Sequence, residues 1–167
     1  LTAFFLLLCS ATRAHDPSVT LPDGFQIQEI ASSALVNDIH AMTFDAKGRL
    51  VVAGRRYIRI LEDDNRDGLA DRAIDFSSGP SFGAMGLWWE DDALFVTDDS
   101  GLYRYFARAR DDKADGPPEE ILKLSPGAEH GFHANRRGHD DGLYVLVGDS
   151  VGVSVKQETA TRSPIRD

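Results

Sequence analysis

The sequence predicts an all-β protein built from consecutive β-propeller blades. Apolar segments bounded by Asp, Gly, Asn and Lys recur about every 45 residues, and each repeat contains four short segments of this kind. No segment keeps a helical apolar period over the length of a helix. Propellers arrange such four-stranded units around a central channel. A β-sandwich whose strands happen to share this spacing is the alternative, because sandwiches also use short, evenly spaced strands.

The first repeat shows the pattern most completely. Its first strand is expected near Met42–Phe44, and a polar turn ending at Arg49 leads into the apolar run that starts at Leu50. Tyr57–Leu61 supplies a third apolar run, and Ala73–Phe76 closes the unit. Each run has the four to seven residues typical of a strand and is bounded by turn-forming residues.

The second and third repeats carry the same landmarks in the same order. Leu94 and Leu143 stand where Leu50 stands in the first repeat, each after an Asp-rich turn. The second repeat also has its own third run and closing stretch, whereas the third repeat is only half covered. Strands are therefore expected near Met42–Phe44, Leu50–Val52, Ile58–Leu61, Leu94–Val96, Leu102–Phe106 and Tyr144–Val147.

About two and a half blades fit in this chain. A partial ring would leave open strand edges, which promote aggregation. The chain is therefore expected to be the N-terminal part of a longer propeller, with Leu21–Ala31 as a lead-in strand that closes the ring.

Length and charge narrow the possible functions. A chain of 167 residues is expected to form one domain, and 27 acidic against 18 basic residues give a net charge of −9. This balance argues against a nucleic-acid partner, which requires a basic surface. A disulfide scaffold is excluded because Cys9 is the only cysteine.

The N-terminus predicts export. Leu1–Cys9 is apolar but far shorter than the roughly 20 residues of a membrane helix. Small residues follow up to Ala14, as at a signal-peptidase site. Residues 1–14 are therefore expected to be a signal peptide and residues 15–167 the propeller domain of a periplasmic or cell-surface protein. A buried N-terminal strand is the alternative.

An acidic loop in the first repeat predicts a calcium site. Asp63, Asn65, Asp67 and Asp71 place side-chain oxygens at alternate positions of a nine-residue segment, with Gly68 allowing a sharp turn. The bidentate glutamate of an EF-hand is missing, so only weak affinity is expected. A solvated acidic turn without metal is the alternative. The matching loop of the second repeat, Asp111–Glu119, has a lysine at the third position, which favours the metal-free turn.

Histidines cluster where inner strands begin. His40 and His133 each stand ten residues before a marker leucine, and both could face the central channel from one level. The segment Glu129–His133 holds one carboxylate and two imidazoles within five residues. His130 could act as a general base beside the carboxylate of Glu129, with His133 close by. Ordinary structural histidines are the alternative. Arg55 and Arg56 could hold an anionic ligand, although a solvated surface pair explains them as well.

The order of these motifs resembles a known group. The run from Glu129 through Gly138–Asp140 and Leu143–Val145 to Asp149 is similar to the third-blade motif of glucose/sorbosone dehydrogenase-type propellers. More closely, residues 21–167 resemble the N-terminal part of membrane-bound dehydrogenase-like proteins of planctomycetes and verrucomicrobia. The match departs from the group's pattern at His139 and Asp141.

The resemblance implies a six-bladed ring and quinone chemistry. Quinoprotein members oxidise sugars with pyrroloquinoline quinone and calcium, and the position of their general base corresponds to His130 here. The resemblance also implies a sugar or alcohol substrate and an electron-acceptor protein as a possible partner. The residues that hold the quinone belong to later blades.

Three functions therefore remain open at the level of sequence. The first is an exported quinone-dependent sugar or alcohol dehydrogenase with His130 as base. The second is a non-catalytic, calcium-stabilised propeller that binds a carbohydrate or a protein. The third is a calcium-dependent lactonase-type hydrolase, which would need several channel-facing oxygen ligands around one metal.

Overall fold

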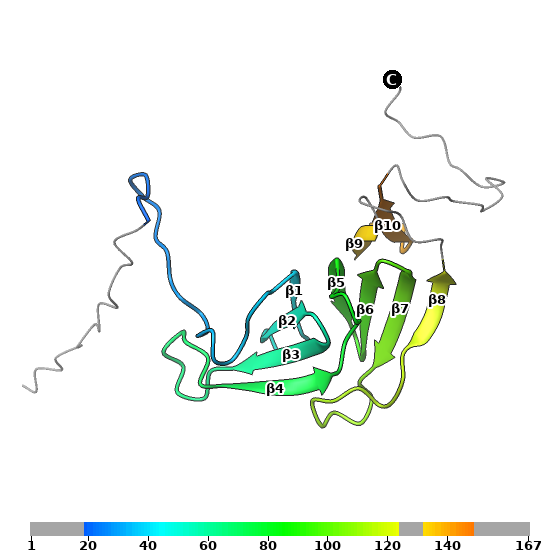
Figure 1. The fold of residues 1–167 in the computed structure, drawn as a ribbon, viewed down its shortest axis with the longest axis horizontal. Coiled ribbons are helices and arrows are strands. Elements are labelled where there is room, and N and C mark those ends of the chain that lie inside the picture. Colours follow the sequence, from blue (N-terminus) through cyan, green and yellow to red (C-terminus); the bar gives the residue numbers. More distant parts are fainter. Residues whose placement is uncertain (1–18, 124–131, 149–167) are drawn as a thin grey trace, which may run out of the picture.

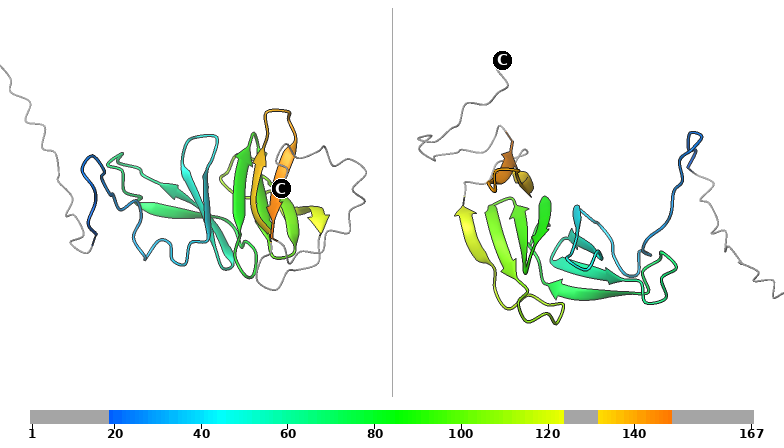
Figure 2. Two further views of the ribbon diagram at one scale, coloured as in Figure 1. Left: turned by 90° about the horizontal axis from the view of Figure 1, so that it is seen from above. Right: turned by 180° about the vertical axis from the view of Figure 1, so that it is seen from behind.

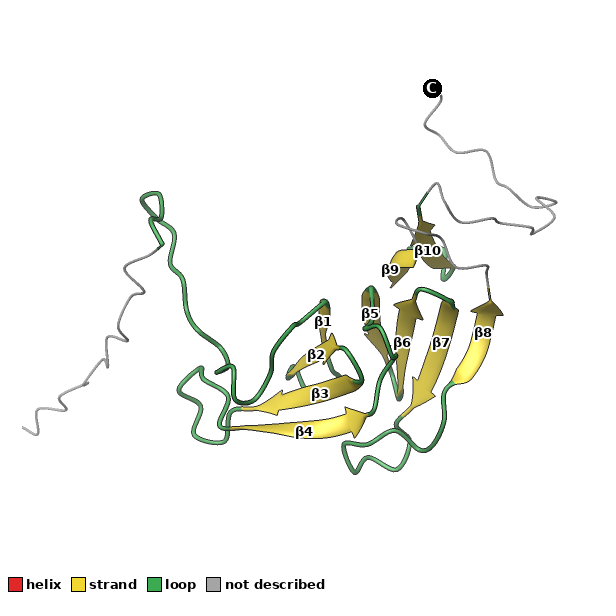
Figure 3. Cartoon of the chain, in the orientation of Figure 1, coloured by secondary structure: helices red, strands yellow, loops and turns green. Residues whose placement is uncertain are grey.

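The computed structural model describes residues 19–123 and 132–148, and these form an all-β fold, as predicted (Figures 1 and 3). Within these ranges there is no helix, and so none that could cross a membrane. The strands are β1 (Ala41–Phe44), β2 (Leu50–Gly54), β3 (Tyr57–Glu62), β4 (Arg72–Ser77), β5 (Gly86–Glu90), β6 (Ala93–Asp98), β7 (Gly101–Phe106), β8 (Glu119–Lys123), β9 (Phe132–Arg137) and β10 (Leu143–Val147). Each predicted strand centre falls within one of them.

The strands form two complete antiparallel blades and the first hairpin of a third. Strands β1 to β4 make blade 1 and β5 to β8 make blade 2, each in chain order, while β9 and β10 pair as blade 3. The repeat seen in the sequence is therefore a structural repeat of propeller blades. Marker leucines Leu50, Leu94 and Leu143 each lie at or next to the start of the second strand of a blade.

Local chemistry sets the first hairpin of blade 1. The Asp45 carboxylate accepts hydrogen bonds from the backbone N–H groups of Lys47 (2.9 Å) and Arg49 (2.8 Å). Gly48 has a φ of 78°, a left-handed conformation that glycine adopts without strain. The turn reverses the chain so that Phe44 pairs with Leu50, and alternate residues of β1 and β2 then point to opposite faces.

The blades stack through their first strands. Strand β1 contacts β5, and β9 contacts both β5 and β6. Figure 2 shows from above and from behind that the sheets fan out from this line of inner strands. A Cβ atom at Gly86 would collide with the carbonyl oxygen of His133, so only glycine lets β5 approach β9 this closely.

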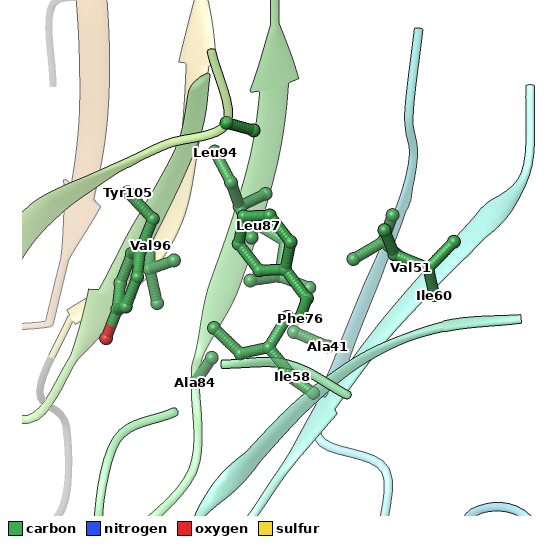
Figure 4. Packing of buried hydrophobic residues seen from close by; sticks show 12 residues of the cluster. Ala41, Val51, Ile58, Ile60, Phe76, Ala84, Leu87, Leu94, Val96 and Tyr105 are labelled. Atoms are coloured by element: carbon green, nitrogen blue, oxygen red, sulfur yellow. The ribbon is translucent and has the colours of Figure 1, made fainter. Parts of the chain in front are cut away.

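The main core lies between blades 1 and 2 (Figure 4). One face of blade 1 contributes Val51, Ile58 and Ile60, and the facing side of blade 2 contributes Leu94 and Val96, all fully buried. A smaller cluster, which includes Ala93, Phe95 and Leu102, joins blade 2 to blade 3. Strands β2 and β6 are continuous apolar runs because packing partners cover both faces of their blades.

The expected lead-in strand is not observed. Residues 19–40 contain no strand, and the last blade, with which the lead-in strand was expected to pair, is not among the described residues. This lead-in segment is tied instead to blade 1, where the Ala70 N–H donates to the Ile30 carbonyl (2.7 Å) and Val36 packs in a cluster with Val52 and Leu61. It thereby covers the outer part of the blade 1 face that points away from blade 2.

Candidate functional site

The predicted calcium loop connects β3 to β4, and its side chains hold the loop's own backbone. Asp63 accepts hydrogen bonds from the N–H groups of Asp67 (3.1 Å) and Gly68 (2.7 Å). Asn65 accepts from the Asp67 N–H, and Asp71 accepts from the Asp64 N–H at 2.8 Å. The four predicted oxygen donors therefore lie in one tightly bonded loop.

No metal cluster is apparent within the described residues. There, no group of three or more His, Cys, Asp or Glu side chains is arranged to hold a metal ion. The amide nitrogen of Asn65, rather than its oxygen, faces Asp71 (3.2 Å). Calcium binding by this loop stays a prediction.

The matching loop of blade 2 aligns differently from the sequence expectation. Spacing places Asp115 at the position of Asp67, but in the structure it takes the place of Asp71. Its carboxylate accepts from the N–H groups six and seven residues earlier, at Ala109 and Arg108, as Asp71 does in blade 1. The reason is that β7 ends at Phe106, so the loop starts earlier than the acidic pattern suggests. Only the hydrogen-bond pairing reveals this alignment.

The two repeat-position histidines lie at the same end of neighbouring blades. His40 directly precedes β1, and His133 is the second residue of β9. His133 is exposed, and its backbone carbonyl accepts a hydrogen bond from the buried Thr97 hydroxyl (2.6 Å). Glu129 and His130 lie outside the described residues, so the proposed base and its carboxylate stay predictions. We refer to this region of the blades as the inner-strand end.

Asp38 is a residue that the sequence reasoning missed. Its carboxylate lies 3.4 Å from Nε2 of His40 and 3.7 Å from Nε of Arg55. The His40 ring is held against Gly83, where a Cβ atom would collide with Nδ1. The spacing of an acid two residues before a histidine was the available signal. The pair presents a carboxylate and an imidazole together at the inner-strand end.

A shallow hollow lies at the same end. Its volume is about 340 Å³ and its walls are Ser81, Phe82, Asp98, Asp99 and Ser100. The carboxylate of Asp98 caps the β6–β7 turn by accepting from the Ser100 and Gly101 N–H groups. Phe82 is 68% exposed beside it. The hollow thus offers an apolar ring next to carboxylates and hydroxyls.

A larger cavity, of about 690 Å³, lies at the opposite end between blades 1 and 2. One cation of its wall is bound by three carboxylates: Arg49 contacts Asp45 (2.8 Å), Glu62 (2.7 Å) and Asp112. The hydrogen bond from Arg49 lowers the pKa of Asp112 well below its usual range, and the same bond raises the pKa of Arg49. Arg49 and its three carboxylates join blades 1 and 2 beside this cavity, and the inner-strand end, where His40 and His133 lie, is the candidate site.

Comparison with known proteins places the chain in one family. The family model described as "Domain of unknown function (DUF7133)" matches residues 13–166. The chain is a DUF7133 protein. No curated protein and no solved structure matches it. In this DUF7133 protein the described residues form two four-stranded blades and one two-stranded hairpin.

Proposed function

We propose that this DUF7133 protein is an exported propeller that oxidises a sugar or alcohol at the inner-strand end, with His130 as general base. The observation that supports the proposal is the placement of His133. It is exposed at the start of β9, the first strand of blade 3, and His130 stands three residues before it. A base must lie within hydrogen-bond reach of the hydroxyl whose proton it removes, and the proposal requires His130 to meet that need at the inner-strand end.

The proposed proton transfer involves two neighbouring residues, His130 and Glu129. The imidazole of His130 would take the hydroxyl proton of the substrate, and the neighbouring carboxylate of Glu129 would stabilise the imidazolium that forms. His133 and the Asp38–His40 pair would supply hydrogen bonds to the remaining hydroxyls of the substrate. The hydrogen on the carbinol carbon would leave as hydride to a bound two-electron acceptor, which an electron-acceptor protein would then reoxidise. The resemblance to glucose/sorbosone dehydrogenase-type propellers supports the same assignment.

The described residues do not by themselves fit pyrroloquinoline quinone. The quinone carries carboxylates and needs cations around it. At the inner-strand end, Arg55 already lies beside Asp38. Asp98 and Asp99 add further negative charge. No step of the proposed reaction is therefore derived through the quinone.

His130→Gln is expected to reduce activity by at least about 10²-fold, because glutamine cannot take up the proton. The measurement is sugar-dependent dye reduction by the full chain supplied with pyrroloquinoline quinone and calcium. His139→Gln is the matched control, since His139 is exposed in the β9–β10 turn at the opposite end of the hairpin. Equal rates for the wild type and the His130→Gln protein would contradict the assignment of the base.

A second candidate is a non-catalytic, calcium-stabilised propeller that binds a carbohydrate or a protein. The excess of carboxylates over free cations at the inner-strand end favours it, because such a surface suits hydroxyl-rich ligands better than an anionic cofactor. Wild-type protein that binds a sugar but neither binds the quinone nor reduces dye would support this candidate over the dehydrogenase.

Calcium binding can be tested separately. Wild-type protein titrated with calcium in a calorimeter is expected to show binding with a dissociation constant of about 10⁻⁴–10⁻³ M. Asp67→Ala is expected to abolish the heat, because the central oxygen donor of the loop is lost. Asp111→Ala, in the equivalent loop of blade 2, should leave the heat unchanged. Equal heats from the wild type and the Asp67→Ala protein would remove the prediction.

A further inference from the structure

The cavity of about 690 Å³ between blades 1 and 2 is lined by three segments of two complete blades. The β1–β2 turn of blade 1 supplies Lys47. The β5–β6 turn of blade 2 supplies Asp91 and Asp92, and the β7–β8 loop supplies Arg110. Because both blades have all four strands, the cavity lies in an interface that the described residues complete. Its volume falls within the roughly 300–1,000 Å³ of pockets that bind small molecules.

Contacts between the two blades hold the walls of this cavity in place. Asp112 of the β7–β8 loop accepts hydrogen bonds from the Lys47 ammonium group (2.9 Å) and from the Arg49 guanidinium (3.1 Å). In the same loop, the Ala114 N–H donates to the Phe76 carbonyl of β4 (3.0 Å). The loop of blade 2 is therefore anchored to blade 1 at two points. Walls that are positioned in advance reduce the entropic cost of binding a ligand.

Trp89 supplies an aromatic surface to the cavity wall. Its indole N–H donates to the Asp91 carbonyl (3.1 Å), and its ring centroid lies 5.4 Å from that of the buried Phe76 ring. The ring is thus fixed, and since its N–H is already bonded, it offers carbon atoms to a ligand. Aromatic side chains bind by burying apolar surface, and the C–H face of a pyranose ring is a surface of this kind.

Charged side chains of both signs surround this aromatic surface. Asp91, Asp92, Lys47 and Arg110 are all exposed and together carry two negative and two positive charges. Among the described residues Arg110 has no ion-pair partner, and the Asp92 carboxylate has only a long contact with Arg108 (3.9 Å). A hydroxyl group both donates and accepts hydrogen bonds, so carboxylates and cations can bind neighbouring hydroxyls of one ligand. An ionic ligand of either sign would also meet like charges.

We propose that this cavity binds a neutral mono- or disaccharide, with the ring of Trp89 stacked on a pyranose ring and Arg110 and Asp92 bonded to its hydroxyls. The cavity lies at the opposite end of the blades from the inner-strand end. It is therefore a second site, and its existence does not rest on the proposed dehydrogenase function. A ligand of this size is expected to bind with a dissociation constant of about 1 mM.

Tryptophan fluorescence of the full chain tests the proposal. The two tryptophans of the chain are neighbours in β5 and point to opposite faces, Trp88 toward blade 3 and Trp89 toward blade 1. Trp88→Phe leaves Trp89 as the only reporter. This replacement is mild, because the buried indole N–H of Trp88 has no hydrogen-bond partner among the described residues.

The Trp88→Phe protein is titrated with glucose, galactose, mannose, xylose, cellobiose and maltose. At least one of these sugars is expected to shift the Trp89 emission and to reduce its quenching by acrylamide, with a midpoint of about 1 mM. Unchanged emission with every sugar at about 50 mM would overturn the proposal. A change with choline but with none of the sugars would overturn it as well and indicate a cationic ligand.

Substitutions on the β7–β8 loop locate the bound sugar. Arg110→Ala should weaken binding at least about tenfold, because hydrogen bonds from a charged group are lost. Lys113→Ala is the matched control, since Lys113 is exposed on the same loop outside the cavity wall. Equal dissociation constants for the Arg110→Ala and Lys113→Ala proteins would overturn the proposal.

A last comparison separates this site from the proposed catalytic site. Arg110→Ala should leave sugar-dependent dye reduction unchanged, and His130→Gln should leave the Trp89 fluorescence titration unchanged. A fluorescence change that His130→Gln abolishes would place the sugar at the inner-strand end and overturn the proposal. Absence of dye reduction in the wild type, together with a titration that depends on Arg110, would support the cavity site and contradict only the dehydrogenase.

Discussion

Replacing Arg49 with alanine is expected to lower the free energy of unfolding by about 3–5 kcal/mol. The Arg49 side chain is 14% exposed and the Asp45 side chain only 2%. Arg49 holds Asp45 and Glu62 of blade 1 together with Asp112 of the β7–β8 loop of blade 2. Without the guanidinium, the Asp45 carboxylate stays buried without its counter-ion. This uncompensated buried charge accounts for most of the expected loss in unfolding free energy.

Urea unfolding of both proteins measures this change. Arg72→Ala is the control, because Arg72 pairs with Asp64 at the surface, where both side chains are about half exposed. Such a pair contributes only about 0–1 kcal/mol. Similar losses for the two variants would show that the buried network does not hold the blades together.

The same network predicts how stability depends on pH. The pKa of Asp112 is held well below its usual range in the folded protein by the hydrogen bond from Arg49. A carboxyl group with a depressed folded pKa stabilises the fold above its unfolded pKa of about 3.9, and that stabilisation is lost as the pH falls toward the folded pKa. Wild-type protein should therefore lose stability below about pH 4 more steeply than the Arg49→Ala protein.

Phe76→Ala is expected to cost about 3–5 kcal/mol of unfolding free energy. Phe76 is 2% exposed and lies at the junction of the two blades (Figure 4). Its ring centroid is 5.4 Å from that of Trp89 and 6.5 Å from that of Tyr105 in blade 2. Removing the ring leaves a cavity that rigid strands on both sides cannot fill by collapsing, so the cost should fall in the upper part of the range for core residues.

Phe82→Ala is the matched control for this variant. Phe82 is 68% exposed on the β4–β5 loop, so its removal should change stability by no more than about 0.5 kcal/mol. Thermal or denaturant unfolding of the wild-type, Phe76→Ala and Phe82→Ala proteins measures both stability changes. A Phe76→Ala protein as stable as Phe82→Ala would show that blades 1 and 2 are not packed as described.

The sequence alone determined the strands and their repeat. Short apolar runs such as Leu50–Ala53, bounded by turns such as Asp45–Arg49, are local signals, and a hairpin needs only its own residues to form. For this reason the marker leucines predicted the second strand of every blade. The expected lead-in strand is absent from the described residues, and the last blade with which it was predicted to pair is not among them; a strand needs a partner edge, which no local pattern supplies.

The tertiary structure alone decided how the blades meet and where charges gather. Arg49 meets Asp112, more than sixty residues away, only because blade 2 stacks on blade 1. Asp38 comes beside Arg55 through the pairing of β1 with β2, and Asp115 takes the place of Asp71 because of where β7 ends. Spacing along the chain cannot encode such contacts, since they depend on the register and stacking of whole sheets.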